Sequence, residues 1–114
     1  MPGKRVLVVE DEAFLALEIG TILRESGMTP IGPTGHSAEA LQMIANLPID
    51  CALLDINLHG ESTEEIAAEL LSRSIPFAFV TGYERDYLPE RFHDAPLIIK
   101  PFAGQKLIAT VRGL

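Results

Sequence analysis

Five apolar stretches separated by polar turns run along the chain and predict the strands of a sheet. They are Arg5–Val9, residues 28–35, Cys51–Asp55, Phe77–Thr81 and Leu97–Ile99. Short apolar runs bounded by turn residues are typical of buried strands. The second stretch contains Pro30 and Pro33, which restrict it to a short extended segment at the edge of the sheet, followed by a loop.

Apolar residues recur at helical spacing between and after these stretches. The inward-facing sets are Leu15, Ile19, Ile22 and Leu23; Leu41, Ile44 and Ala45; Ile66, Ala67, Leu70 and Leu71; and Leu107, Ile108 and Val111, the last within a helix over residues 103–112. Gly27 is predicted to close the first helix. Ser37 is the predicted N-cap of the second helix, and Ser62 with Glu65 forms a predicted capping box for the third.

Residues 83–96 carry the weakest helical pattern. Only Leu88 and Phe92 form a helical pair, and Pro89 fits only in a first turn. We therefore expect a short or mobile helix four. The five-fold alternation of strand and helix predicts an α/β fold, a three-layer sandwich whose parallel sheet has helices on both faces. For five strands, the flavodoxin-like order 2-1-3-4-5 is the natural choice.

Composition narrows the class of protein. A chain of 114 residues predicts one domain over residues 1–114, and 47% hydrophobic residues argue against disorder. The net charge of −7 argues against nucleic-acid and membrane-surface binding, which need a basic face. No apolar run is long enough to span a membrane, and the N-terminus does not resemble a signal peptide. The single cysteine, Cys51, lies in an apolar run as a buried, inert thiol, and a reducing cytoplasmic setting is expected.

The predicted strands end in residues that can carry out chemistry. These are Glu10 and Asp11 after the first strand, Asp55 at the end of the third, Thr81 at the end of the fourth and Lys100 after the fifth. The carboxyl ends of parallel strands lie on one edge of a sheet, so these side chains should converge there. Each residue alone has a structural explanation, but their joint placement favours a functional site.

The acidic residues predict a magnesium site. Mg²⁺ is held in proteins by a few carboxylates together with water and phosphate oxygens. Glu10, Asp11 and Asp55 are the predicted side-chain ligands, and the main-chain carbonyl of Asn57 is a candidate for completing the oxygen shell. A cation here would remove the repulsion that keeps a carboxylate from attacking an anionic phosphoryl group.

The other residues suit phosphoryl transfer to Asp55. Attack by the Asp55 carboxylate on phosphorus would give an acyl phosphate. Lys100 is predicted to pair with one phosphoryl oxygen as a point charge, and the Thr81 hydroxyl to donate a hydrogen bond to another. Gly82 is predicted to leave room for the phosphoryl group.

The whole chain resembles the receiver domain of two-component response regulators. The matching motifs are VVEDE, LLDINL, FVTGY and IIKPF, in order and at suitable spacing. The resemblance implies transfer of a phosphoryl group from a phosphohistidine of a sensor histidine kinase, or from a phosphotransfer protein, to Asp55, with Mg²⁺ required. It also implies a cis peptide between Lys100 and Pro101. Such a domain is not an enzyme in the usual sense, because it catalyses only its own phosphorylation and dephosphorylation. Its output partner, unknown here, would be contacted through the region of helix four and strand five.

The stretch PFAFVTGY resembles a receiver subfamily named for a Phe-Ala-Thr-Gly-Tyr motif and found in alphaproteobacteria, with Val80 in place of the motif's alanine. Leu97 stands where many receivers carry an aromatic residue, and His59 where many carry proline. Phosphorylation is expected to draw Thr81 toward the site and to shift the helix-four region. Gly82 and Tyr83 belong to this predicted switch, Tyr83 as a substitute aromatic or a gate over the acyl phosphate; a tyrosine without a switching role is the alternative.

Three other interpretations of the sequence compete with a phosphorylatable receiver. A pseudo-receiver would act as an interaction module without phosphorylation, but Asp11, Asp55, Thr81 and Lys100 are all present. A flavodoxin-type mononucleotide binder would need a phosphate-binding loop rich in Gly, Ser and Thr after the first strand, where acidic residues stand instead. A haloacid-type phosphatase would need a second aspartate at the position of Asn57.

Overall fold

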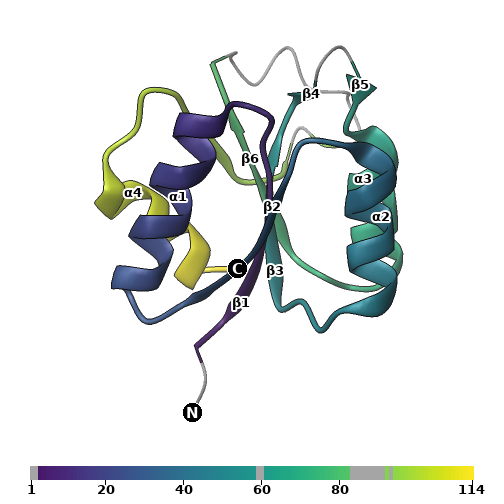
Figure 1. Cartoon of the computed structure of the whole chain (residues 1–114), viewed down its shortest axis with the longest axis horizontal. Helices are drawn as coiled ribbons and strands as arrows, with labels where there is room; N and C mark the ends of the chain where they lie inside the picture. The colour runs from purple at the N-terminus through teal and green to yellow at the C-terminus, as the bar shows by residue number, and fades with distance from the viewer. Residues whose placement is uncertain (1–2, 59–60, 83–91, 93) are drawn as a thin grey trace.

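The computed structural model describes residues 3–58, 61–82, 92 and 94–114 (Figure 1). Within these residues, five parallel strands form one sheet: β1 (Arg5–Val9), β2 (Thr29–Thr34), β3 (Cys51–Asp55), β6 (Phe77–Thr81) and β7 (Leu97–Ile99). Their order is β2-β1-β3-β6-β7. This is the predicted order 2-1-3-4-5, and the prediction of a flavodoxin-like sheet with β2 at its edge is confirmed.

Helices cover both faces of the sheet, so the described part of the chain has three layers. Helices α1 (Ala13–Glu25) and α4 (Gly104–Arg112) lie on one face, and α2 (Ser37–Asn46) and α3 (Glu64–Ser72) lie on the other (Figure 1). The alternation of side chains along a strand separates two apolar cores. Val6 and Val8 of β1 pack with α1 and α4, whereas Leu7 and Val9 pack on the side of α2 and α3.

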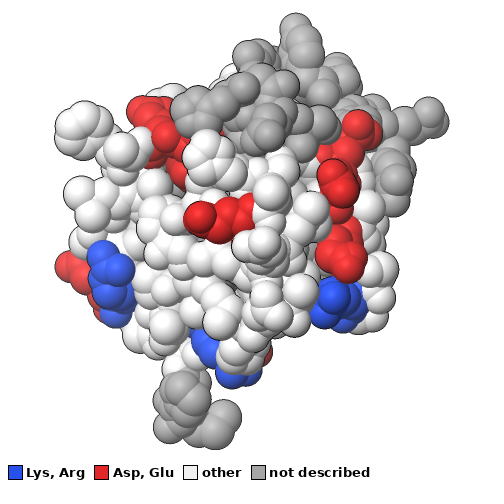
Figure 2. All heavy atoms as spheres, turned by 45° about the vertical axis from the view of Figure 1, so that its right-hand side comes forward, with Lys and Arg blue, Asp and Glu red and all other residues white. Residues whose placement is uncertain are grey.

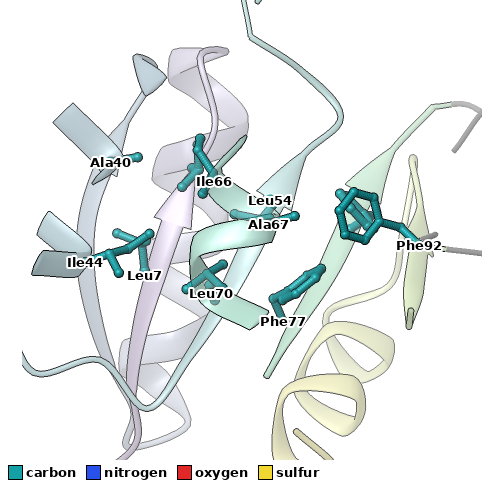
Figure 3. Packing of buried hydrophobic residues seen from close by; sticks show 12 residues of the cluster. Leu7, Ala40, Ile44, Leu54, Ile66, Ala67, Leu70, Phe77 and Phe92 are labelled. Carbon is teal, nitrogen blue, oxygen red and sulfur yellow. The ribbon is translucent and has the colours of Figure 1, made fainter. Parts of the chain in front are cut away.

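Three phenylalanines extend the second of these cores (Figure 3). The ring centroids of Phe77 and Phe79 lie 5.5 Å apart, and Phe92 lies 6.2 Å from Phe77 and 5.9 Å from Phe79. Phe92 belongs to the segment for which we predict a short or mobile helix four. Most of that segment, residues 83–91 and 93, lies outside the described residues, so the prediction stays untested.

The end of α1 follows the prediction closely. The cap residue is Ser26, and Gly27 directly after it has a positive φ of 81°. The N–H of Gly27 donates to the carbonyl of Arg24 at 3.0 Å, and the N–H of Met28 donates to the carbonyl of Leu23 at 2.9 Å. This pair of hydrogen bonds is a Schellman motif, in which a left-handed residue such as glycine closes the helix.

Both predicted N-caps are wrong. Ser37 is the first residue of α2, and His36 is its N-cap. The reason is a tight turn before the helix, in which the N–H of His36 donates to Thr34 Oγ1 at 3.2 Å. Ser62 lies in an extended segment, and Thr63 is the N-cap of α3.

The displacement of Ser62 comes from a hairpin that the sequence analysis did not predict. Strand β4 (Asn57–Leu58) pairs antiparallel with β5 (Glu61–Ser62) directly after Asp55. In the sequence, only His59 and Gly60 lie between the two strands of this hairpin. A two-residue connection favours a hairpin, so this spacing could have predicted it.

Two predicted inward-facing residues are also wrong. Ala45 is exposed, and Ala40 is buried with Ile44 in its place. Leu71 of α3 is 51% exposed, whereas Ile66, Ala67 and Leu70 are buried. In both helices, the residue next to a buried one lies about 100° around the helix axis and leaves the packed stripe.

Candidate functional site

The structure brings the strand-end residues together at the carboxyl edge of the sheet, the upper edge in Figure 1. Glu10 follows β1 and Asp55 ends β3; these strands are neighbours, with Val9 paired to Leu54 in the register. The ammonium of Lys100, directly after β7, lies 3.1 Å from Glu10 Oε1 and 3.6 Å from Asp55 Oδ2.

Three carboxylates form an acidic cluster, which we define as Glu10, Asp11 and Asp55. Each offers an oxygen that lies within 4.8 Å of the oxygens of the other two. Glu10 is only 4% exposed and Asp55 only 9%, while Asp11 is half-buried. Negative charges this close and this poorly solvated repel one another. A positive charge between them would stabilise the arrangement.

The pKa of Glu10 reflects this repulsion. Burial, and then the adjacent Asp55, raise the pKa of the Glu10 carboxyl to about 7. The N–H of Glu12, which donates to Glu10 Oε2 at 3.1 Å, and the ammonium of Lys100 act in the opposite direction. These two donors do not offset burial and the Asp55 charge, so the pKa of Glu10 stays raised.

The residues fit a magnesium ion. The second oxygen of Glu10, Oε1, is buried and, within the described part of the chain, has Lys100 at ion-pair distance but no hydrogen bond of good geometry. A buried oxygen in this condition, with two neighbouring carboxylates, is a ready ligand for a hard cation. Carboxylate oxygens are the ligands that Mg²⁺ prefers.

Thr81 and Lys100 are held next to each other by their main chains. The N–H of Lys100 donates to the carbonyl of Thr81 at 2.7 Å, and Thr81 is buried. The peptide between Lys100 and Pro101 is cis, which confirms what the resemblance implies. At Gly82, a side-chain Cβ would meet no described atom within 4 Å.

The remaining predicted site residues are only partly covered. The main chain of Asn57 lies in β4, two residues after Asp55, and the role of its carbonyl stays a prediction. Tyr83 and His59 lie outside the described residues, so the gate predicted for Tyr83 and the departure at His59 are untested. Leu97 is the first residue of β7.

Residues 6–112 match the family model of the response regulator receiver domain. The chain belongs to this family. It is 30% identical over 112 residues to the transcriptional regulatory protein PdtaR of Mycobacterium tuberculosis, which covers 95% of this chain and 55% of that protein. It is also 30% identical to the phosphate regulon transcriptional regulatory protein PhoB of Escherichia coli, over 98% of this chain and 52% of that protein. The receiver chain thus spans about half the length of these curated relatives.

Solved structures agree with the fold. The solution structure of SdrG from Sphingomonas melonis Fr1 is similar with a TM-score of 0.87 and 34% identity, covering 98% of this chain and 96% of that chain. The receiver domain of PhyR from Erythrobacter litoralis is similar with a TM-score of 0.86 and 25% identity, covering 99% and 90%.

Family membership supplies the general setting. Receiver domains are signalling regulators of two-component systems that interact with histidine kinases or phosphotransfer proteins, and they typically bind Mg²⁺ through an acidic cluster. Among the described residues, none of the helices combines the length and apolar character needed to cross a membrane.

Proposed function

We propose that this receiver is a phosphoacceptor in which Asp55 takes a phosphoryl group from a sensor histidine kinase or a phosphotransfer protein. The observation that carries the proposal is the position of the Lys100 ammonium, 3.1 Å from Glu10 and 3.6 Å from Asp55, beside an acidic cluster that also includes Asp11. A purely structural sheet edge has no need for buried carboxylates beside an ammonium.

In this proposal, Glu10, Asp11 and Asp55 hold Mg²⁺, and the main-chain carbonyl of Asn57 adds a further oxygen. When bound, the ion neutralises the repulsion between the acceptor carboxylate and the phosphoryl oxygens. Glu10 would hold the ion through its carboxylate, whose buried Oε1 accepts no well-formed hydrogen bond from the described residues. Asp11 has a short side chain and therefore holds the ion more directly.

The other residues act on the phosphoryl group. A carboxylate oxygen of Asp55 forms the bond to phosphorus while the bond from phosphorus to the donor imidazole nitrogen breaks, and the electron pair returns to that nitrogen. Lys100 turns from Glu10 toward a phosphoryl oxygen and pairs with it as a point charge. Thr81 donates its hydroxyl to another oxygen, and Gly82, where a Cβ would meet no described atom within 4 Å, leaves room for the group.

The switch would run through Thr81, Gly82 and Tyr83 to the region of helix four and β7. The phosphoryl group adds a charge of about −2 near neutral pH, enough to order a loop through a few charge-assisted hydrogen bonds. A structure of SdrG in its BeF3-activated conformation is similar to this chain, with 37% identity and a TM-score of 0.81, which supports a phosphorylatable receiver over a pseudo-receiver. The output partner would be a protein that reads this region by contact.

The finer assignments are proposals of the same kind. We place the chain in the Phe-Ala-Thr-Gly-Tyr subfamily, which its FVTGY motif and its likeness to SdrG and PhyR support.

We propose a single receiver domain over residues 1–114 that works in the cytoplasm and does not bind nucleic acid. Among the described residues on the face shown in Figure 2, acidic side chains gather mainly in the upper half, the end that carries the site, and basic ones lie in the lower half. An acidic end of this kind would repel a nucleic-acid backbone.

Intact mass spectrometry after incubation with acetyl phosphate and Mg²⁺ tests the proposal. The wild-type chain should gain one phosphoryl group that hydroxylamine removes, as expected of an acyl phosphate, and Asp55→Asn should gain none. The main-chain fold of the variant is checked by circular dichroism. An unmodified wild-type chain, with acetyl phosphate still intact, would favour the pseudo-receiver, and an equal gain in Asp55→Asn would place the acceptor elsewhere.

A further inference from the structure

We infer that Gly35, in the turn between β2 and α2, fixes the position of Asp11 and thereby makes the cation site selective for Mg²⁺ over the larger Ca²⁺. The inference rests on the proposed function, because it assumes that the acidic cluster binds a divalent cation. Gly35 would be a positioning residue, acting through Asp11 without touching the ion.

The first step is the close approach of Gly35 to Asp11. A Cβ atom at position 35 would lie 3.0 Å from Asp11 Cα and 3.1 Å from Asp11 Cβ. Both distances are shorter than ordinary contacts between carbon atoms, which lie at about 3.5–4.0 Å. The atoms approached belong to the main chain and to the root of the side chain, so no flexible end can swing away. Only glycine lets the turn lie this close to the aspartate.

The second step is that hydrogen bonds hold the main chain on both sides of the contact between Gly35 and Asp11. On the side of the acidic cluster, the N–H of Glu10 donates to the carbonyl of Thr34 at 2.9 Å, directly before the contact. On the side of the turn, Thr34 is buried and pairs with Val9 of β1 in the sheet register. The Thr34 hydroxyl accepts a hydrogen bond from the N–H of His36 at 3.2 Å and donates to the His36 carbonyl at 3.4 Å. The turn is therefore fixed on both sides of Gly35.

The third step connects this geometry to the ion. A side chain at position 35 would displace Asp11 by a few tenths of an ångström, while Glu10 and Asp55 stay anchored at the ends of β1 and β3. Mg²⁺ requires near-octahedral ligands at about 2.0–2.1 Å, whereas Ca²⁺ accepts a variable shell at about 2.3–2.6 Å. A shift of one ligand relative to the other two should thus weaken Mg²⁺ binding more than Ca²⁺ binding. In the sequence, nothing marks Gly35, because the contact arises from the pairing of β2 with β1.

Isothermal titration of the full chain with MgCl₂ and with CaCl₂ tests the inference. We expect Gly35→Ala to bind Mg²⁺ about tenfold more weakly, in the range found when groups that orient metal ligands are removed, with the Ca²⁺ affinity changed much less. Gly113→Ala is the matched control: its Cβ would meet carbonyl oxygens of α4 at 3.5 Å and 3.7 Å, which are ordinary contacts remote in the chain from the cluster. This control should bind both ions as the wild type does.

A second variant tests the route through Asp11 and does not depend on the folding of Gly35→Ala. Asp11→Glu keeps the charge but moves the carboxylate by one methylene, so it should lower the ratio of Mg²⁺ to Ca²⁺ affinity in the same direction. Adding Gly35→Ala to Asp11→Glu should then change the ratio little.

The outcomes separate the inference from the function on which it rests. A wild-type chain that binds neither ion would overturn the proposed metal site itself. A wild-type chain that binds Mg²⁺, together with a Gly35→Ala variant that keeps the same affinity ratio, would overturn only the role of Gly35. Equal losses for both ions in Gly35→Ala would also overturn it, because they would indicate general damage to the turn.

Discussion

Glu10 is the most buried acidic residue among those that the structure describes, and its burial has a consequence for folding. Its pKa is raised from an ordinary 4.5 to about 7, first by burial and then by Asp55. As the pH rises through this window, the unfolded chain gives up its proton before the folded chain does. The contribution of Glu10 to the free energy of unfolding is therefore fully present below pH 4.5. It is lost as the pH rises toward 7 and above.

The neutral isostere should reverse this loss in metal-free protein. Glu10→Gln removes the buried charge, so we expect it to raise the free energy of unfolding at pH 8 by about 2 kcal/mol and to change it much less at pH 5. Urea titrations in EDTA at the two pH values measure the effect. A variant that is less stable than the wild type at pH 8 would show that the Glu10 charge is compensated in the folded protein.

Cys51 illustrates the opposite case, a titratable group without a functional role. It is fully buried in β3, and burial raises the pKa of its thiol to about 11. At pH 8 only about one thiol in a thousand would be ionised, and a reagent has no path to it. We expect almost no reaction with a disulfide thiol reagent in the native protein and one full equivalent in urea. Rapid native labelling at pH 8 would contradict this burial.

The site residues could largely be predicted from the sequence, for a reason that holds at the residue scale. Glu10, Asp55, Thr81 and Lys100 each stand where an apolar run stops, and the topology of a parallel sheet brings such positions to one edge. The role inferred for Gly35 could not be predicted, because its neighbour Asp11 is set by the pairing of strands β1 and β2 and not by nearby sequence.

At the scale of the elements, strands were easier to predict than helix ends. The bounds of β1, β3, β6 and β7 match the prediction, since buried strands are continuous apolar runs with polar ends. The helix starts differ because hydrogen bonds of the preceding turn or hairpin fix them. The Thr63 hydroxyl, for example, donates to the carbonyl of Ile56 across the β4–β5 hairpin, and this places the start of α3 after Thr63.

Phe92 offers a stability test at the same scale. It is only 2% exposed and its ring packs against Phe77 and Phe79. Phe92→Ala should lower the free energy of unfolding by about 3 kcal/mol, as is typical of a buried phenylalanine. Phe14→Ala is the matched control, because Phe14 is 85% exposed and should change stability little. Similar urea midpoints for the two variants would mean that the packing of Phe92 against Phe77 and Phe79 contributes little to stability.

At the scale of the whole molecule, the proposed function requires the acidic end of Figure 2 to receive a phosphorylated protein. Phe14 and Leu17 are exposed on the same side of α1, about one turn after Glu10 and Asp11. Exposed apolar residues that lie next to a functional site are candidates for a protein contact. If the phosphodonor docks here, Phe14→Ser should slow phosphorylation by a kinase several-fold and leave phosphorylation by acetyl phosphate unchanged. Equal rates with both donors in the variant and the wild type would place the docking surface elsewhere.

The metal dependence of Asp55 phosphorylation tests the central claim most directly. The fraction of phosphorylated chain after a fixed time with acetyl phosphate is measured by mass spectrometry across a series of Mg²⁺ concentrations, for the wild type and for Asp11→Asn. We predict no modification in EDTA, saturation with rising Mg²⁺ in the wild type, and half-saturation at a higher Mg²⁺ concentration in Asp11→Asn. Phosphorylation of Asp55 to the same extent in EDTA as in Mg²⁺ would show that the acidic strand ends do not act through a divalent cation.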